Sequence, residues 1–421
     1  MLKRTAAEAI DALGNQRNVA ITMDDGIISE VVHETSAADS VVLPAFVNAH
    51  DHARPMRPSS VGGFAMPLEI WLNRLALFCP VDPYLAAVAP LARAALGGQC
   101  AVMIHHTRPM GFTDLPTEAA AIARAAADVG VRIAFGVGLR DQNPIVYGAA
   151  DTVLDALDPE VRAEVEGRFL TPVKPIVEQL ANVDAVAERI QGAMVNVQYA
   201  PNGPQWCSNA LWVAIAEASA QTGRRITTHL FETKYQRDWA DRTFPDGMIR
   251  WFKDIGLLSP RLTLAHCVWA RPDELDLIAE AGCTIAINTS SNLALRSGIA
   301  PVAEMVRRGC KVAMGLDGQA FDEDDDAVRE ARMLWSLHSG WSFDNELTTQ
   351  QVLQISQENG RAALGAPHGG RIATGAAADL LVIDRAGLDD RARVEAGDPR
   401  FCTPPEKRVE IRGVPPDPEP L

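Results

Sequence analysis

The residues best suited to chemistry are histidines at the ends of short apolar segments. His50 and His52 are separated by one residue, and the two-residue period of a β-strand points both imidazoles to the same side. Other apolar segments end, far along the chain, at His229, His266 and Asp317. Neutral imidazole nitrogens with one carboxylate suit a divalent metal such as zinc, and they leave a coordination position open for water.

The combination of these five side chains carries the metal interpretation. A pair of histidines spaced like His50 and His52 is, on its own, more often a surface or core feature than a metal site. Five polar groups buried together at one apolar end of a protein would destabilise it unless they shared a ligand. A bound metal would turn water into a hydroxide nucleophile near neutral pH, and Asp317 could accept the proton that is released.

A carboxylate stands close to one of these histidines in the sequence. Glu232 follows His229 by three residues, so we expect it in the loop just past the end of that strand. There it could pass protons between a metal-activated water and a substrate. A solvated loop carboxylate is the alternative interpretation, and it would be preferred if no metal ligand stood nearby.

The elements that must position these residues follow one repeated pattern. An amphipathic helical segment, often ended by a glycine, is followed by a short apolar run of strand length. The eight apolar runs lie at 43–49, 100–105, 131–138, 194–200, 225–230, 262–266, 283–288 and 311–317. Eight βα units over roughly 320 residues predict a TIM-like (β/α)8 barrel with its chemistry at the carboxyl ends of the strands. An open doubly wound sheet is the alternative.

The two ends of the chain are expected to form a separate small β domain. Residues 18–32 read as two strands around the turn sequence Asp24-Asp25-Gly26, and 378–384 and 408–412 again resemble strands. The predicted organisation comprises part of a β-sandwich at 1–42, the catalytic barrel at 43–366, and the rest of the sandwich with a proline-rich tail at 367–421. A helical insertion near the barrel mouth is expected at 151–189.

Composition excludes several classes of protein. The 421 residues include 54 acidic and 39 basic side chains, and the net charge of −15 argues against a nucleic-acid-binding protein. No run of 18 apolar residues indicates a membrane span, and no apolar signal-peptide core follows the start of the chain. The seven cysteines are scattered without a CxxC pair, which favours reduced thiols and a cytoplasmic location.

Several segments together resemble one family. The run 43–52, LPAFVNAHDH, is similar to the first-strand motif of the amidohydrolase superfamily, and the later histidines and aspartate follow in that superfamily's order. HLFE at 229–232, LAHCVW at 264–269 and SSNLALRSGIAPV at 290–302 resemble the cytosine deaminase and triazine hydrolase branch. The ADL run at 378–380 is similar to a late segment of the superfamily, so the resemblance covers nearly the whole chain.

This resemblance implies a role for each residue of the site. The metal ligands would be His50, His52, His229 and Asp317. His266 would hydrogen-bond the bound water or the developing oxyanion, and Glu232 would move a proton between that water and a ring nitrogen or leaving group. Binuclear members use a carboxylated lysine from the fourth strand, whereas 194–199 contains no lysine or carboxylate. One divalent ion per chain, zinc first and iron second, is therefore expected.

Substrate contacts are predicted only from position. Polar residues at strand ends, and one residue of the segment that relatives lay across the pocket, give five candidates: His105, Gln205, Trp206, Asn288 and Trp71. For each of them a packing or solvated role is an equal alternative. The acidic run 322–326 is expected to begin a helix, where carboxylates complement the helix dipole, rather than to bind a second metal.

The leading functional hypothesis is a metal-dependent deaminase of a nitrogen heterocycle of pyrimidine, purine, pterin or triazine type. Hydrolysis of an amide, urea, N-alkylamine or carbon–halogen bond on a related small molecule is the alternative reaction. A non-catalytic metal-binding scaffold is the alternative class, but such a protein would be expected to lose ligands, and all are present here. The resemblance also implies a homodimer or higher homo-oligomer.

Overall fold

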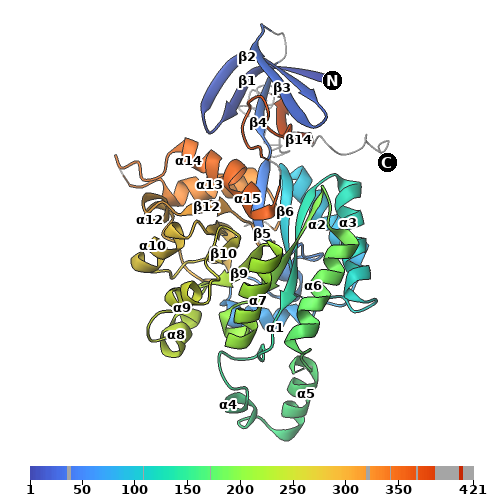
Figure 1. The fold of residues 1–421 in the computed structure, drawn as a ribbon, viewed down its shortest axis with the longest axis vertical. Coiled ribbons are helices and arrows are strands. Elements are labelled where there is room, and N and C mark those ends of the chain that lie inside the picture. Colours follow the sequence, from blue (N-terminus) through green and yellow to red (C-terminus); the bar gives the residue numbers. More distant parts are fainter. Residues whose placement is uncertain are drawn as a thin grey trace, which may run out of the picture.

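Two β-sheets organise the chain, and both chain ends contribute to the smaller one (Figure 1). The computed structural model describes residues 1–35, 39–107, 109–170, 172–318, 323–341, 343–366, 368–384 and 407–410. No helix among these described residues is long and apolar enough to cross a membrane. The predicted proline-rich tail lies outside them.

The larger sheet is the predicted barrel. Its eight strands are parallel and neighbour one another in chain order. They are β5 (Phe46–Asp51), β6 (Gln99–His106), β7 (Arg132–Leu139), β8 (Val195–Pro201), β9 (Ile226–Leu230), β10 (Leu262–His266), β11 (Thr284–Ile287) and β12 (Lys311–Met314). The first and last strands meet where the backbone N–H groups of Leu316 and Asp317 donate to the His50 carbonyl, at 3.2 and 2.9 Å. This contact closes the ring at the end where the strands finish.

The eighth strand is shorter than the sequence predicts. The apolar run was expected to continue to Asp317, but β12 ends at Met314 and Asp317 lies in the turn that follows. The left-handed backbone at Asp317, with φ of 58°, bends the chain towards the end of β5. The aspartate therefore reaches the site from a turn rather than from a strand.

Helices surround the barrel. The main ones are α2 (Pro83–Leu96), α3 (Leu115–Val129), α6 (Ile176–Ile190), α7 (Asn209–Thr222), α8 (Lys234–Thr243), α9 (Met248–Asp254), α10 (Pro272–Glu280), α11 (Thr289–Ala294), α12 (Val302–Arg307), α13 (Ala327–His338), α14 (Thr349–Leu353) and α15 (Asn359–Leu364). Helix α7 begins and ends as its sequence indicates: the Ser208 hydroxyl accepts from the Leu211 N–H, and Gly223 ends it with φ of 71°.

Small side chains fill the centre of the barrel. Ala49, Ala134, Ala286 and Ala313, from four different strands, belong to one buried cluster. Alternate strand residues such as Phe46 belong to a second cluster under the helices. Because neighbouring strand residues face opposite sides, this alternation places small groups in the narrow interior and larger ones in the outer layer.

The smaller sheet has six strands in the order β14-β13-β4-β1-β2-β3. Their bounds are β1 (Leu2–Asp11), β2 (Gly14–Asp24), β3 (Ile27–His33), β4 (Ser40–Pro44), β13 (Leu380–Asp384) and β14 (Lys407–Glu410). The sheet folds back on itself, because the Ile28 N–H donates to the Ala376 carbonyl at 2.8 Å, just before β13. Residues 43–44 belong to this sheet, so the predicted first barrel strand begins slightly later, at Phe46.

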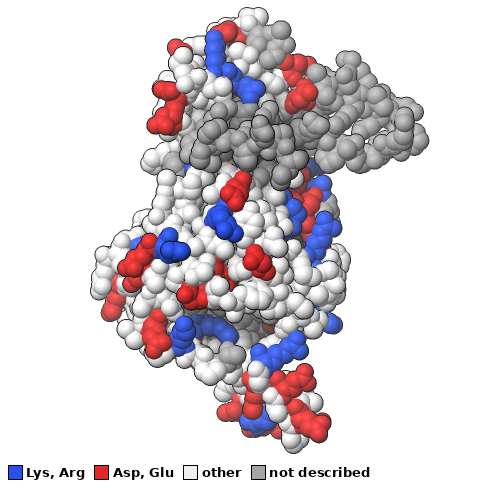
Figure 2. Space-filling model, turned by 90° about the vertical axis from the view of Figure 1, so that its right-hand side faces the viewer, with Lys and Arg blue, Asp and Glu red and all other residues white. Residues whose placement is uncertain are grey.

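The segment expected as an insertion contains three helices with two different positions. Helix α6 packs against α3 and β8 as part of the ring around the barrel. In contrast, α4 (Asp151–Leu154) and α5 (Pro159–Phe169) project away from the ring at the end opposite the small sheet (Figure 1). No residue of α5 is buried. Acidic and basic side chains cover this projecting tip, and charges of both signs are interspersed on the face shown in Figure 2.

Candidate metal centre and active site

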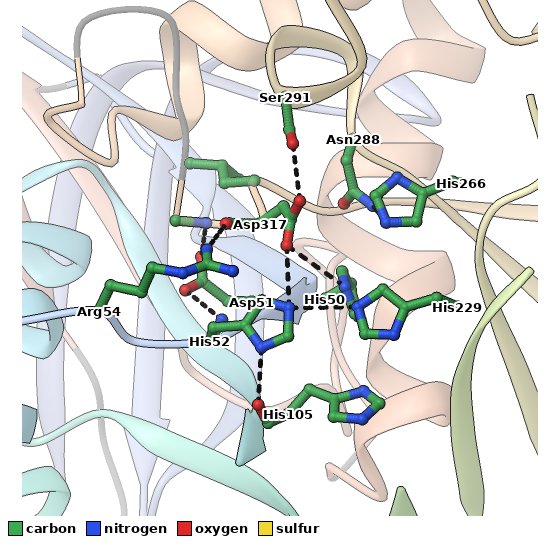
Figure 3. A network of polar contacts seen from close by, with 12 residues as sticks. His50, Asp51, His52, Arg54, His105, His229, His266, Asn288, Ser291 and Asp317 are labelled. Atoms are coloured by element: carbon green, nitrogen blue, oxygen red, sulfur yellow. Dashed lines mark hydrogen bonds and ion pairs between the residues drawn. The ribbon is translucent and has the colours of Figure 1, made fainter. Parts of the chain in front are cut away.

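The predicted metal-binding residues meet at the carboxyl ends of the barrel strands (Figure 3). One ligand atom from each of His50, His229, His266 and Asp317 lies within 4.8 Å of the others. His52 adjoins this group, because its Nε2 is 3.2 Å from His229 Nε2 and 3.2 Å from Asp317 Oδ1. The five residues therefore form one cluster, as their placement at strand ends predicts.

Backbone carbonyls fix the protonation of two imidazoles. His52 Nδ1 lies 2.8 Å from the His105 carbonyl oxygen, and His229 Nδ1 lies 2.6 Å from that of Asn202. A carbonyl oxygen only accepts, so each Nδ1 carries a proton and each neutral ring directs its Nε2 lone pair into the cluster. Burial lowers the pKa of His50 to about 4, so this ring is also neutral at physiological pH.

This arrangement fits a bound metal cation. The Nε2 lone pairs of His52 and His229 face each other at 3.2 Å, and they repel unless a cation or proton lies between them. Both ring nitrogens of His50 and the Oδ1 of Asp317 are buried without a well-formed hydrogen bond among the described residues, although His50 Nε2 lies 3.4 Å from that oxygen. Buried polar atoms normally have partners, so these atoms indicate a missing ligand. Imidazole and carboxylate donors of this kind match a zinc site.

Asp317 is restrained by residues that sequence reasoning did not assign to it. The Ser291 hydroxyl donates to Asp317 Oδ2 at 2.6 Å, which leaves Oδ1 facing the histidines. Arg54 donates from Nη1 to the Asp317 backbone carbonyl, also at 2.6 Å. The only available signal for Ser291 was its place just after the seventh strand, where polar residues face the barrel mouth.

Asp51, between the paired histidines, ties the first strand to the turn after the last. Its Oδ1 accepts from the His52 backbone N–H at 2.7 Å, and its Oδ2 accepts from the Gly318 N–H at 2.9 Å. Asn48 Nδ2 donates to the same Oδ2 at 2.8 Å. Asp51 thus fixes the separation between His52 and the turn that carries Asp317. Sequence analysis gave Asp51 no role, because the motif does not show that the turn after the last strand lies beside it.

Glu232 and His266 form the opposite side of the centre. Glu232 Oε2 is 3.7 Å from His266 Nε2, and its Oε1 is buried without a hydrogen-bond partner among the described residues. Asn292 Oδ1 lies 2.8 Å from His266 Nδ1, so that nitrogen carries a proton and Nε2 is left as an acceptor. Burial raises the pKa of Glu232 to about 7, and the charge of Asp317 adds to this effect. Such a carboxyl group can both donate and accept protons near neutral pH.

A pair of glutamines holds Glu232 from behind. Gln236 Oε1 accepts from the Glu232 backbone N–H at 2.9 Å, and Gln236 Nε2 donates to Gln205 Oε1 at 2.6 Å. Phe231, just before Glu232, has a left-handed backbone with φ of 48°, which needs such support. Gln205, predicted to contact substrate, therefore acts on the loop that carries Glu232.

The other predicted substrate contacts fall into two groups. Trp71 and Trp206 line a cavity of about 340 Å³ in front of the cluster. His105, Gln205 and Asn288 are buried, and the structure does not place them among the described residues that line it. Proximity to a strand end does not determine whether a side chain faces the cavity or the protein interior. Position alone therefore predicted substrate contact for all five residues, although only two of them line the cavity.

The two buried candidates outside the glutamine pair contact histidines of the cluster. The His105 carbonyl accepts from His52, and the His105 ring Nε2 donates to the Ala200 carbonyl at 3.1 Å. Asn288 Nδ2 lies 3.5 Å from His266 Nε2, the acceptor nitrogen of that ring (Figure 3). Both residues therefore position metal-centre groups.

The cavity is large enough for a small planar molecule. Its floor contains His52, His229, Glu232 and Asp317. Helix α1 (Leu68–Leu75) covers one side, with Trp71 fixed by a hydrogen bond from its Nε1 to the Gly63 carbonyl at 3.0 Å. Apolar side chains also line the wall: Leu68, Leu72, Leu75, Phe169 and Leu295. Apolar side chains beside a few converging polar groups are typical of a small-molecule site.

The described part of the acidic run has a structural role. The Asp326 side chain accepts from the N–H groups of Val328 and Arg329 at the start of α13. Asp325 forms an ion pair with Arg93 at 2.9 Å. Asp322 lies outside the described residues. Among the described residues, the only group that could hold a metal is the histidine and aspartate cluster.

Comparison with known proteins shows which family the chain resembles. Residues 41–405 match the Amidohydrolase family. The chain is 28% identical over 383 residues to a 5'-deoxyadenosine deaminase of Methanosarcina barkeri, covering 88% of this chain and 81% of that protein.

Two solved structures show that the fold is shared. A zinc-bound adenosine deaminase from Xanthomonas campestris gives a TM-score of 0.75 at 21% identity, over 98% of this chain and 91% of that chain. A zinc complex of atrazine chlorohydrolase from Arthrobacter aurescens gives 0.78 at 21% identity, over 98% and 94%. Because the family match extends over most of the chain and includes every residue of the cluster, this chain belongs to the amidohydrolase family.

Proposed function

We propose that the chain is a metal-dependent hydrolase that deaminates a nitrogen heterocycle of pyrimidine, purine, pterin or triazine type. One observation carries this proposal: the buried carboxyl group of Glu232 shares a cavity with the histidine and aspartate cluster. Hydrolytic deamination of a ring needs a nucleophile and a nearby acid, and these two parts face the same space. The deaminase relative supports this choice of reaction.

The chain would hold one divalent ion, preferably zinc. His50, His52, His229 and Asp317 would bind it, as their free nitrogen and oxygen atoms indicate. When bound, the metal lowers the pKa of a water molecule towards neutrality and so supplies a hydroxide nucleophile. Catalytic metal sites keep one position open for water beside their protein ligands.

The protein side chains would handle the protons. The Asp317 carboxylate can take the proton that the attacking water loses, and the hydrogen bond from Ser291 to its Oδ2 fixes the orientation of this group. His266 Nε2, left as an acceptor, would hydrogen-bond and orient that water. Glu232, with a pKa of about 7, would protonate the ring nitrogen beside the attacked carbon. The resulting Glu232 carboxylate would take the proton of the hydroxyl group on the attacked carbon and pass it to the amino group, so that ammonia leaves a carbonyl. Exchange with solvent would return Asp317 and Glu232 to their starting protonation.

An ammonia-release assay tests this proposal. Zinc-loaded protein should release ammonia from at least one member of a panel of aminated pyrimidines, purines, pterins and triazines. Glu232→Gln should keep the metal and lose about 100-fold or more in kcat, since general acid–base catalysis contributes 10²–10⁴. Glu217→Gln, on the exposed side of α7, is the matched control and should behave as wild type.

The same panel decides between leaving groups. Alkylamine or chloride release without ammonia would replace deamination by the alternative hydrolytic reaction. A zinc-loaded wild type whose Glu232→Gln variant retains full turnover would contradict the proposed proton transfer.

Two further features remain predictions. A cytoplasmic location rests on the reduced-thiol pattern of the cysteines, and homo-oligomer formation rests on the family resemblance. Sedimentation of the purified protein measures the second directly.

A further inference from the structure

The outer wall of the cavity carries positive charge that the proposed reaction does not use. Arg140, just after β7, and Arg168, in the last turn of α5, both line the cavity. The acidic residues that line it are Glu232 and Asp317, and both belong to the reaction centre. Among the described lining residues, the wall away from that centre therefore has cations and no carboxylate.

The Arg140 guanidinium has no counter-charge within the described part of the chain. Its backbone N–H donates to Gln179 Oε1 at 3.2 Å, but its side chain makes no hydrogen bond or ion pair there. The side chain is half-buried between the loop and the cavity. A partly desolvated cation without a partner destabilises the folded protein. The half-buried guanidinium therefore indicates a site for an anionic ligand.

Arg168 lines the same cavity and connects two helices. One nitrogen, Nη2, donates to the Ala76 carbonyl at 3.0 Å and joins the end of α5 to the end of α1. The remaining N–H groups of this guanidinium are available, because no ion pair of Arg168 exists among the described residues. By comparison, Arg162 on the same helix pairs with Asp155 and Glu166, both at 2.8 Å. Arginines of α5 thus have acidic partners on the tip and lack them at the cavity.

We propose that Arg140 and Arg168 bind an oxyanion, a carboxylate or phosphate, at the end of the substrate remote from the attacked ring. This inference rests on the proposed function and narrows its substrate class to acidic heterocycles. Guanidinium groups recognise both oxyanions through paired N–H donors. Trp206 and Phe169 line the same cavity and would cover the ring and its linker. A neutral base would leave the Arg140 cation uncompensated.

Matched substrate pairs test the proposal. Two pairs are pterin with pterin-6-carboxylate and cytosine with cytosine-5-carboxylate. Adenosine forms two more pairs, one with adenosine-5'-carboxylate and one with adenosine-5'-monophosphate. Zinc-loaded wild type should have a kcat/KM for at least one acidic member that is about 10- to 100-fold above its neutral partner, the range of a charge-assisted hydrogen bond. Comparing the two adenosine acids separates carboxylate recognition from phosphate recognition.

Variants assign that preference to the arginines. Arg140→Gln removes no side-chain hydrogen bond that the described residues make, so it should fold normally and lose the preference for the acidic member through KM. Arg140→Lys should restore only part of it, because lysine lacks the paired donors. Arg168→Gln should weaken the preference less, since this residue is more exposed. Arg162→Gln is the matched control and should change neither member of a pair.

The outcomes separate this inference from the proposed function. Ammonia release that is equal within pairs, or a preference that Arg140→Gln leaves unchanged, overturns the anion site and leaves deamination standing. If no member releases ammonia, deamination fails, and fluorescence titration with pterin and pterin-6-carboxylate decides the anion site. Binding selective for the acid and lost in Arg140→Gln supports it, and equal or absent binding of the acid overturns it.

Discussion

The floor and the outer wall of the cavity are built in different ways. At the floor, strand ends and short turns carry the reactive groups, and partners such as Ser291, Asn292 and Asp51 fix their orientation. The wall consists of α1, the loop after β7 and α5, a helix with no buried residue. Rigid elements thus hold the chemistry, whereas adaptable elements surround the variable part of a substrate.

One carboxylate joins these two regions. Glu69 on α1 accepts from the Tyr147 hydroxyl at 2.9 Å and from the Thr233 hydroxyl at 2.6 Å, both through Oε1. Thr233 directly follows Glu232, and Tyr147 precedes α4. Helix α1 over the cavity is therefore linked both to the loop that carries Glu232 and to the projecting segment. Substitutions from the floor to the wall of the cavity test how far the two regions act separately.

Removing a floor ligand should have the largest effect. Asp317→Ala deletes the carboxylate that faces the imidazoles, so we expect loss of bound metal and a fall in kcat of more than about 1000-fold. Metal content by mass spectrometry and turnover should fall together. An Asp317→Ala protein with one equivalent of zinc would contradict the ligand assignment.

Removing the clamp between the first and last strands should have the next largest effect. Asp51→Ala deletes acceptors for the His52 and Gly318 N–H groups, and loss of such outer contacts lowers metal affinity or activity about 10- to 100-fold. Competition with a zinc chelator measures the affinity. Unchanged zinc affinity and unchanged turnover would show that the strand ends are held without Asp51.

Loosening the loop behind the proton-transfer group should cost less. Gln236→Ala removes the acceptor of the Glu232 N–H. We expect kcat to fall about 10-fold with KM nearly unchanged, because the general acid is displaced but not removed. Gln236→Glu keeps that acceptor and loses only the donor to Gln205, so it should recover part of the rate. A change confined to KM would instead place Gln236 in substrate binding.

Changing the wall should have the smallest effect. Tyr147→Phe removes one hydrogen bond to Glu69, which contributes about 1 kcal/mol, so KM should rise about 2- to 5-fold with kcat retained. Steady-state kinetics on any turned-over heterocycle provides the measurement. A loss of kcat as large as that of Gln236→Ala would mean that the wall and the floor act as one unit.

The sequence was most informative in segments where the hydrophobic periodicity of a strand ends at a residue that can bind a metal. The alternation of His50 and His52, and apolar runs ending at His229 and His266, predict both the barrel and its metal centre, and the structure brings these residues together. The eight parallel strands confirm the fold class, and the family match confirms the resemblance. Strand ends converge in any such barrel, so this step needed no knowledge of side-chain contacts.

Side-chain direction near the cavity was not available from the sequence. Trp206 and Gln205 are adjacent in the chain, yet Trp206 lines the cavity and Gln205 is buried against Gln236. The 3-10 turn at Pro204–Trp206 separates them, and neither residue type indicates which side it takes. Arg168 likewise reaches the cavity that Arg140 lines through the placement of α5, which its hydrogen bond to the Ala76 carbonyl ties to the end of α1.

The order of residue types along the chain determined which strands exist and which segments carry groups that can bind a cation, because these properties depend on local periodicity. Tertiary structure alone decided which polar groups face the cation, which support them from behind and which face the substrate. Those roles depend on atoms that are close in space and distant in sequence. Asp51 and Gly318 illustrate this, since one hydrogen bond of 2.9 Å joins residues from opposite ends of the barrel sequence.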